Sequence, residues 1–236
     1  LIARMQGMTN NVEKRNGPAG YSGATGNTSL TQEFIDMFEL KNGKLPKEDP
    51  EYDPQKPWEN RCERFKASVL YNGSYWWDRE VETFVGGKDY TALNSTAKGC
   101  ITGYTLRKHL DPEVRISGVE KNTFHDFPLL RYAEILLNYA EALNEAEGPT
   151  AEVYNAVNKI RRRAQLLDLP ANLTKDEMRN KIRQERRVEL AFENHRFWDV
   201  RRWKIAEIVD NKKVHKITVN ADGTYSYPVF QNRVFD

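Results

Sequence analysis

The feature that most constrains this chain is a pair of helical periodicities on either side of Gly148-Pro149. Apolar residues recur every three or four positions before this dipeptide and again after it. The two stripes are Leu129, Ala133, Leu136, Leu137, Ala140 and Leu143, then Val153, Ala156, Val157, Ile160, Ala164 and Leu167. Because this spacing gathers apolar side chains on one face of a helix, the sequence predicts two helices joined by a tight turn. Together they have the length of one tetratricopeptide unit, about 34 residues.

A single unit of this kind leaves apolar faces uncovered, because helical repeats usually need about three copies to bury them. Either neighbouring units lie outside this sequence or the helices that follow take their place. Thr174 and Glu177 form a capping-box pattern, which predicts a helix through Phe192, a break near Asn194 and a second helix over 197–209. The predicted fold class is mainly α, of the alpha-alpha superhelix type: a tetratricopeptide-like helical hairpin, further C-terminal helices and a loop-rich segment with short β-hairpins.

The first half of the chain differs, since it holds most of the glycine, proline and asparagine residues. Residues 1–120 are predicted to be a loop-rich, ligand-facing region. It contains a short helix over 31–40 and two strands, at 67–71 and 81–85, that we expect to pair as a small β-hairpin. The change of character falls near 124–128.

The remaining regions complete the predicted organisation. Residues 121–210 form the helical scaffold, and residues 211–236 return to strands and turns, with a hairpin turn at Asp222-Gly223. We expect these regions to make one continuous domain of a longer protein, with its tail truncated.

The charge balance argues against nucleic acid as a partner. Lys and Arg number 36 against 34 Asp and Glu, a net charge of +2, whereas proteins that bind a phosphate backbone carry a marked basic excess. The basic residues over 159–204 alternate with acids and with aromatics that we expect to be buried, namely Phe197, Trp198 and Trp203. This pattern is typical of salt bridges within a protein.

Catalytic and metal-binding motifs are missing from the sequence. It contains no glycine-rich phosphate loop after a strand, no His-Glu-x-x-His and no Gly-x-Ser-x-Gly. Cys62 and Cys100 lack metal-type spacing, and they are compatible with a disulfide, two free thiols or one of each. We therefore predict no catalytic residue, no metal site and no cofactor.

The densest cluster of charges lies in 182–203. Glu185, Glu189 and Glu193 are spaced by four, so they line one helical stripe with arginines on the flanking turns. With His195 nearby, the carboxylates could serve as metal ligands or as an acid/base pair. The favoured interpretation is an interior ion-pair network, because guanidinium groups match carboxylates bidentately and buried charges persist only when paired. His195 is expected to bond locally.

The turn-rich segment 71–80 holds four aromatic residues. Successive side chains of an extended segment point to opposite sides, so Trp76 and Trp77 cannot both face the core, and we expect one to face solvent. Exposed rings cover the C–H patches of a pyranose while polar neighbours bind its hydroxyls. The predicted ligand-binding residues are Trp76, Trp77, Tyr75 and Tyr21, with Asp78 and Arg79 as hydroxyl partners.

Two other interpretations of this segment stay open. In one, Trp77 fills a local core and Trp76 is incidental. In the other, Asp78 acts with Glu80 or Glu82 as the paired carboxylates of a glycosidase, although nothing in the sequence sets their separation.

Three ordered segments carry a resemblance to a known family. Residues 127–142 (FPLLRYAEILLNYAEA), 157–164 (VNKIRRRA) and 182–203 (IRQERRVELAFENHRFWDVRRW) closely resemble the C-terminal half of SusD/RagB-family proteins. Upstream, residues 34–38 and 69–73 fit the same family in order. The resemblance covers nearly the whole chain.

The resemblance implies a mostly helical surface lipoprotein of the Bacteroidetes outer membrane that contains tetratricopeptide repeats. Such proteins capture glycans, or peptides in RagB-like members, and lie as a lid on a SusC-like TonB-dependent transporter. The implied location is the cell surface, with membrane contact only through a lipid anchor that this sequence lacks. The patterned helices are scaffold in this family, so the motifs themselves assign no ligand-binding residue.

The chain also departs from the family pattern. The lipidated N-terminal cysteine and the closing Pro-Ile-Pro-type segment are missing, and Cys62 stands where an Asp-Pro pair often follows the arginine. From the first two departures we expect a truncated chain. The favoured function is non-catalytic glycan binding, and the alternatives are peptide binding and glycoside hydrolysis.

Overall fold

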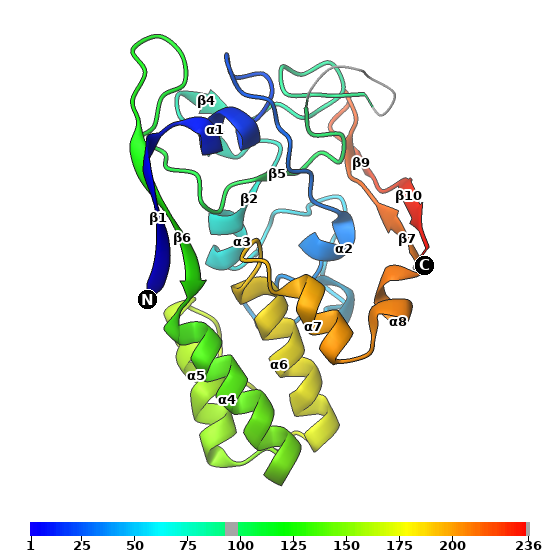
Figure 1. The fold of residues 1–236 in the computed structure, drawn as a ribbon. Coiled ribbons are helices and arrows are strands. Elements are labelled where there is room, and N and C mark those ends of the chain that lie inside the picture. Colours follow the sequence, from blue (N-terminus) through cyan, green and yellow to red (C-terminus); the bar gives the residue numbers. More distant parts are fainter. Residues whose placement is uncertain (93–98, 235–236) are drawn as a thin grey trace.

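The computed structural model describes residues 1–92 and 99–234 (Figure 1). The helices are α1 (Asn11–Asn16), α2 (Gln32–Ile35), the 3₁₀ turn η1 (Pro46–Glu48), α3 (Glu63–Ser68), α4 (Tyr132–Glu147), α5 (Ala151–Arg163), α6 (Lys175–Glu189), α7 (Arg196–Arg202) and α8 (Ala206–Asp210). The strands are β1 (Ile2–Thr9), β2 (Val69–Leu70), β3 (Tyr75–Trp76), β4 (Arg79–Glu80), β5 (Thr105–Leu106), β6 (Thr123–Leu130), β7 (Lys212–His215), β8 (Thr218–Val219), β9 (Tyr225–Ser226) and β10 (Val229–Arg233). They form two-stranded antiparallel sheets.

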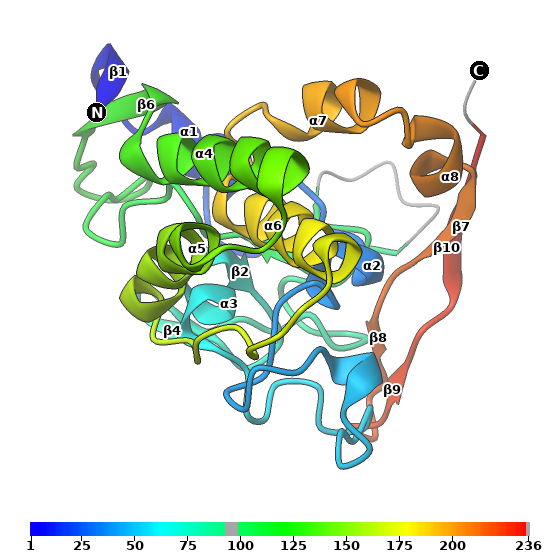
Figure 2. The same ribbon diagram turned by 90° about the horizontal axis from the view of Figure 1, so that it is seen from below.

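The helical hairpin predicted around Gly148-Pro149 is present as α4 and α5. These helices and α6 lie side by side at one end of the molecule (Figures 1 and 2). Their facing residues form a buried cluster of Ala140, Val153, Ala156, Val157, Leu169, Met178 and Ile182. The start of α6 also follows the prediction, because the Thr174 side chain accepts from the Glu177 amide while the Glu177 carboxylate accepts from the Thr174 amide. A tetratricopeptide superhelix stays a prediction.

The region near 124–128, predicted as a boundary, is a strand. β6 pairs antiparallel with β1, from Ile2 opposite Leu130 to Thr9 opposite Thr123. Leu129, assigned above to the helical stripe, therefore lies in β6, and α4 begins only at Tyr132. Pairing between segments more than 100 residues apart leaves no periodic signal in either one.

The hairpin predicted between 67–71 and 81–85 is wrong. Residues 63–68 form α3, β2 pairs with β5, and the hairpin of this region is β3–β4, with Tyr75 opposite Glu80. Phe84 instead bridges in parallel to Val219. The β2–β5 pair puts Val69, Leu70, Thr105 and Leu106 in the interior. The C-terminal hairpin at Asp222-Gly223 is confirmed as β8–β9.

Two predicted helices are shorter than expected, and side chains from other segments cap the carbonyl groups at their ends. α2 ends at Ile35, where the buried Arg61 donates to the carbonyl oxygens of Ile35 and Phe38. α6 ends at Glu189 rather than Phe192, whose left-handed φ of 64° does not fit a helix, and Lys108 donates to the carbonyls of Glu189 and Ala191. The stretch predicted as one helix over 197–209 is divided into α7 and α8.

The main core packs α2, α3 and α6 against the β2–β5 region. Its buried members are Leu30, Ile35, Phe38, Cys62, Phe65, Val69, Tyr104, Leu166, Val188 and Ile217. Both cysteines are free, buried thiols, which excludes the disulfide alternative. Among the helices that the structure describes, none is both long and apolar enough to cross a membrane.

Candidate functional site

The three glutamates spaced by four lie in a buried network of ion pairs. Glu185, Glu189 and Glu193 are only 3–5% exposed. Glu185 binds Arg64 of α3 at 2.7 Å and Arg161 of α5 at 3.2 Å. The ion-pair interpretation is therefore confirmed, although the partners come mainly from distant segments rather than from flanking turns.

Arg131 and Lys108 hold the other two glutamates at the end of α6. Arg131 binds Glu189 and Glu193 at 2.6 Å each and also donates to the Glu189 carbonyl. Lys108 Nζ bonds to Glu193 at 2.6 Å and to two backbone carbonyls. All three donors of Lys108 are used, so this side chain offers no hydrogen bond to a ligand. Lys108 and Arg131 together tie the segment after β5 and the end of β6 to the end of α6.

The electrostatics of Glu189 and Glu193 do not suit acid/base catalysis. Burial by itself would raise the pKa of Glu189, but Arg64, Arg131 and Arg163 together lower it below its ordinary value. The pKa of Glu193 is lowered in the same way by Arg131 and Lys108. Both groups stay ionised and paired at neutral pH. The described residues contain no group of three or more His, Cys, Asp or Glu that could hold a metal ion.

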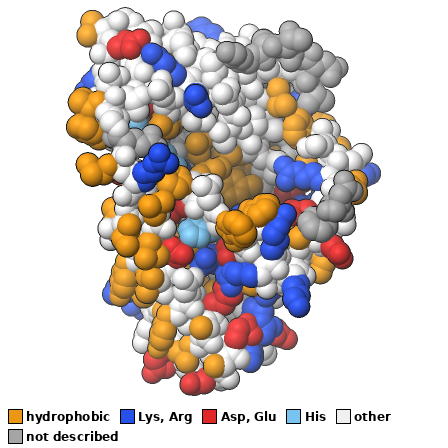
Figure 3. Space-filling view, viewed as in Figure 1, with side chains coloured by type: hydrophobic (Ala, Val, Ile, Leu, Met, Phe, Trp, Pro, Cys, Tyr) orange, Lys and Arg blue, Asp and Glu red, His pale blue; other side chains and the backbone are white. Residues whose placement is uncertain are grey.

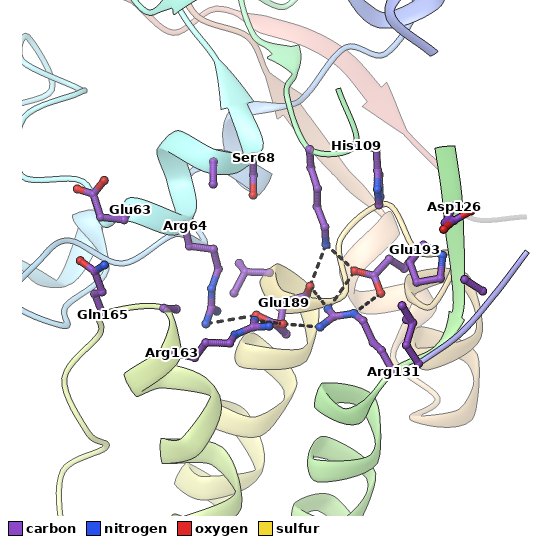
Figure 4. Close-up of a pocket in the computed structure, with 17 residues that line it drawn as sticks. Glu63, Arg64, Ser68, His109, Asp126, Arg131, Arg163, Gln165, Glu189 and Glu193 are labelled. Atoms are coloured by element: carbon purple, nitrogen blue, oxygen red, sulfur yellow. Dashed lines mark hydrogen bonds and ion pairs between the residues drawn. The ribbon is translucent and has the colours of Figure 1, made fainter. Parts of the chain in front are cut away.

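A pocket of about 570 Å³ lies over this network (Figure 4). Its lining includes Leu1, Ala3 of β1, Ala67 and Ser68 of α3, Pro128 of β6, and Val188 of α6. Figure 4 shows Arg64 and Arg163 reaching Glu189 from one side and Arg131 from the other. The volume is within the range of small-molecule sites, about 300–1,000 Å³.

Some polar groups of this pocket remain available. Nε and Nη1 of Arg64 and Nε2 of His109 are buried and have no hydrogen-bond partner in the described part of the chain. Burial lowers the pKa of His109, and Lys108 lowers it further, so the imidazole is neutral at neutral pH. Asp126 and Gln165 lie at the exposed rim. Such a set can bind hydroxyl or carbonyl groups, and sequence patterns did not reveal it because its members come from four separate segments.

Two of the predicted ligand-binding residues are core residues. Trp76 is 2% exposed and Tyr21 is 6% exposed, and both pack with Leu70, Val81 and Leu110. The Tyr21 hydroxyl donates to the carbonyls of Trp76 and Arg79. Neither ring offers a free face, so the expectation that Trp76 stacks on a sugar is corrected.

The other four predicted residues surround that core. Tyr75 is 64% exposed and the Asp78 side chain is also exposed, with no hydrogen bond or ion pair to the described residues. Trp77 is half-buried and has a left-handed φ of 52°, which breaks the strict alternation of an extended strand. Tyr21 packs edge-on against it, with ring centroids 5.5 Å apart. Arg79 is held by Asp89 at 2.7 Å.

The structure also corrects expectations about 195–203. Phe197 is 53% exposed and Trp198 is 66% exposed, whereas both were expected in the interior. Trp203 is half-buried, with the guanidinium groups of Arg183 and Arg202 each 4.7 Å from its ring centroid. His195 lies 3.6 Å from Glu134 of α4, so its partner is not local.

Comparisons with known proteins agree with the sequence motifs. The model of the SusD family matches residues 3–236. SusD-like protein P2 of Formosa agariphila is 38% identical over 114 residues, which are 44% of this chain and 23% of that protein. SusD-like protein P38 of the same organism is 41% identical over 90 residues, 34% of this chain and 18% of that protein.

Solved structures share the fold. A SusD-like protein from Bacteroides fragilis superposes with a TM-score of 0.84 at 26% identity, over 100% of this chain and 49% of that one. Another protein of Bacteroides fragilis, described as a SusD-like carbohydrate binding protein, gives a TM-score of 0.77 at 27% identity, over 95% of this chain and 47% of that one. The chain thus spans about half the length of these solved relatives.

Proposed function

The chain belongs to the SusD family, and on that premise we propose that it is part of a non-catalytic protein that binds oligosaccharides or polysaccharides at the cell surface. The protein hands them to a SusC-like TonB-dependent transporter of the outer membrane, to which it is tethered by a lipid anchor. The observation that carries this proposal is the family match over residues 3–236 together with a relative described as carbohydrate binding.

We place the glycan contacts at the β3–β4 hairpin. Tyr75 presents an open ring, Asp78 a free carboxylate, and Trp77 a partly covered ring beside them. A pyranose can lay its C–H face on the tyrosine while a hydroxyl donates to the carboxylate. Trp76 and Tyr21 support the hairpin from beneath, and Arg79 is fixed by Asp89.

Isothermal titration calorimetry against a panel of polysaccharides tests this function. Tyr75→Ala and Asp78→Asn should each weaken binding by about 1–3 kcal/mol. Tyr139→Ala is the matched control, because Tyr139 is a 49% exposed aromatic residue on α4, and it should bind as the unmodified chain does. Equal affinities for all three variants would exclude the hairpin, and variants of His109 and Gln165 would then test the pocket of Figure 4.

The same titrations separate the alternative functions. Release of shortened sugars would identify a glycosidase that uses Asp78 with Glu80 or Glu82. Heat from a peptide library, with none from glycans, would identify a RagB-like peptide-binding protein. Delivery is tested by co-purification with a SusC-like transporter, and failure of the two to associate would contradict that part of the proposal.

A further inference from the structure

Some half-buried arginines of the C-terminal helices lack a paired acid. Arg186 of α6 binds Asp199 at 2.7 Å, and Arg202 of α7 binds Asp199 and Glu141. By contrast, the side chains of Arg183, Arg187 and Arg196 make no hydrogen bond or ion pair with any residue that the structure describes. Arg183 lies over the Trp203 ring, 4.7 Å from its centroid, which leaves Arg187 of α6 and Arg196 of α7. Because a partly desolvated charge is costly without a counter-charge, this exception needs an explanation.

Both arginines line one cavity of about 510 Å³ between α6 and α7. The loop that joins these helices forms its wall, and Phe192 and Asn194 in that loop have left-handed φ angles of 64°. The apolar part of the lining consists of Leu190, Ala191, Phe192, Phe197 and Trp198. The only acidic residue of the lining, Asp199, is already bound by Arg186 and Arg202.

Further positively charged side chains surround this cavity. Burial lowers the pKa of Arg187 to about 10, and the charge of Arg196 adds to the effect. Lys212 of β7 and Arg233 of β10 also act on Arg187 or its neighbours, and the pKa of Lys212 is lowered by burial and by Arg187. The opposing acids are Asp210, Glu33 and Asp199. Glu33 is bound to His215 at 2.6 Å, and Asp199 is bound by Arg186 and Arg202. Among the described residues four cations therefore face three acids, two of which have their own partners.

An aromatic rim adjoins the cationic cavity. Phe197 and Trp198 are both more than half exposed, and their rings pack edge-to-face with centroids 5.0 Å apart. Figure 3 shows hydrophobic side chains grouped near the centre of this face, close to α7, with Lys and Arg side chains beside them. The Arg201 guanidinium lies over the Phe197 ring, 3.5 Å from its centroid, so Trp198 is the ring available to a ligand. With guanidinium groups that have no partner among the described residues beside it, it provides both parts of an acidic sugar's binding site: apolar contact for the ring and donors for its anionic group.

We propose that the cavity between α6 and α7 binds the carboxylate or sulfate group of an acidic saccharide, through Arg187 and Arg196, with the sugar ring against Trp198. The inference rests on the proposed glycan-binding function and adds to it a class of ligand, uronate-containing or sulfated glycans. It places the anionic group at the guanidinium forks, which match carboxylate and sulfate oxygens bidentately. Neutral glycans have no group that would pair with these two charges.

The first experiment uses inorganic sulfate as the probe, so it does not depend on any glycan. Sulfate should bind the unmodified chain in calorimetry at low ionic strength, and Arg187→Gln or Arg196→Gln should weaken that binding about tenfold. Arg15→Gln is the control, because Arg15 is an exposed, unpaired arginine on α1 and its loss changes the net charge equally. Sulfate binding that is unaffected by the two cavity variants, or equally reduced by the control, would show an adventitious ion only and overturn the proposal.

The second experiment compares acidic and neutral oligosaccharides of the same backbone. The acidic form should bind more tightly by about tenfold, and Arg187→Gln and Arg196→Gln should each remove that preference while leaving neutral binding unchanged. Trp198→Ala should weaken binding of the acidic form, because it removes the contact with the sugar ring. Equal affinity for the two forms would overturn this inference and leave the proposed function intact. Failure of both forms to bind would overturn the proposed function, and the sulfate titration would still report separately on the cavity.

Folding of the variants is a check that also carries information. Since the Arg187 side chain has no partner to lose among the described residues, Arg187→Gln should keep or raise the melting temperature. Sulfate should raise the melting temperature of the unmodified chain only. A marked fall in the melting temperature of Arg187→Gln without ligand would assign the arginine to the scaffold and count against the proposal.

Discussion

At the scale of single residues, Glu189 shows how the chain uses a buried charge. Its carboxylate receives Arg64 from α3, Arg131 from the end of β6 and Arg163 from α5. A buried ion pair adds modest net stability, but removing one partner leaves the others desolvated without compensation. The network is therefore best tested by truncating its acid.

Replacing Glu189 with alanine should destabilise the fold by about 3–5 kcal/mol, because Arg64 and Arg131 lose a buried counter-charge. Urea unfolding followed by circular dichroism measures the change. Glu147→Ala, at an exposed position near the end of α4, should leave the midpoint unchanged. A Glu189→Ala protein as stable as the control would contradict the structural role of the network and return this acid to the candidate ligand contacts.

At the scale of elements, local sequence and local structure agree where a helix or turn satisfies its own backbone groups. The start of α6 is such a case, since Thr174 and Glu177 bond reciprocally to each other's amide groups. The ends of α2 and α6 are different, because Arg61 and Lys108 reach them from other segments.

Thr174→Ala should lower the free energy of unfolding by about 1 kcal/mol, since an N-cap side chain is lost. Chemical denaturation against Asn180→Ala, an exposed position on the same helix, is the test. The control should be neutral or slightly stabilising because alanine has the higher helix propensity. If Thr174→Ala unfolds at the same midpoint as Asn180→Ala, the capping box contributes nothing to stability.

Gly103→Ala should destabilise the chain more than Gly223→Ala. Both glycines have positive φ, 81° and 84°, so each substitution strains the backbone. A methyl group at position 103 would lie only 2.7 Å from the Ile217 carbonyl oxygen, whereas position 223 faces open space. Comparing the thermal unfolding of the two variants separates the cost of the steric contact with Ile217 from the cost of backbone strain, which both variants share. Equal losses of stability would mean that the contact with Ile217 relaxes freely.

At the scale of the whole molecule, short sheets and ion pairs join segments distant in sequence. β1 and β6 connect the start of the chain to α4, and Ile217 bonds through its amide to the Thr102 carbonyl. Glu141, Glu189 and Glu193, which bind basic residues of other segments, have lowered pKa values. Their stabilising effect is fully present above the ordinary glutamate pKa, about 4.3, and is lost as the pH falls through the lowered folded-state values.

We therefore expect the free energy of unfolding to fall as the pH drops below about 4. The effect comes from Glu141, Glu189 and Glu193. Burial alone would raise the pKa of each carboxyl, but its hydrogen-bonded and basic partners lower it by more, so the net pKa is below the ordinary value. Asp36 acts in the opposite direction, since burial raises its pKa. Urea titrations at a series of pH values measure the slope, which should be shallower in Glu189→Gln. A stability independent of pH in this range would contradict the pairing.

The predictability of the candidate site differs from residue to residue. The spacing of Glu185, Glu189 and Glu193 predicts that they take part in an ion-pair network. Their partners Arg64 and Lys108 could not be predicted, because they lie 121 and 85 residues away from the acids that they bind. The aromatic segment 71–80, predicted as a turn-rich stretch, contains the β3–β4 hairpin, which the sequence did not predict. Which of its rings is exposed depends on what packs beneath it. Trp76 is buried against Tyr21, which lies 55 residues earlier in the chain and donates its hydroxyl to the Trp76 carbonyl.

The sequence by itself determined the helical hairpin, the capped start of α6, the turn at Asp222-Gly223 and the family. Each of these rests on residues close together in the chain, whose spacing fixes a backbone shape before any packing occurs. Only the tertiary structure decided that β1 pairs with β6, that Trp76 is buried while Trp198 is exposed, and that Arg187 and Arg196 share a cavity whose lining acid, Asp199, is bound by Arg186 and Arg202. Burial and ion pairing depend on which distant segments come into contact, and the local spacing of residues does not determine those contacts.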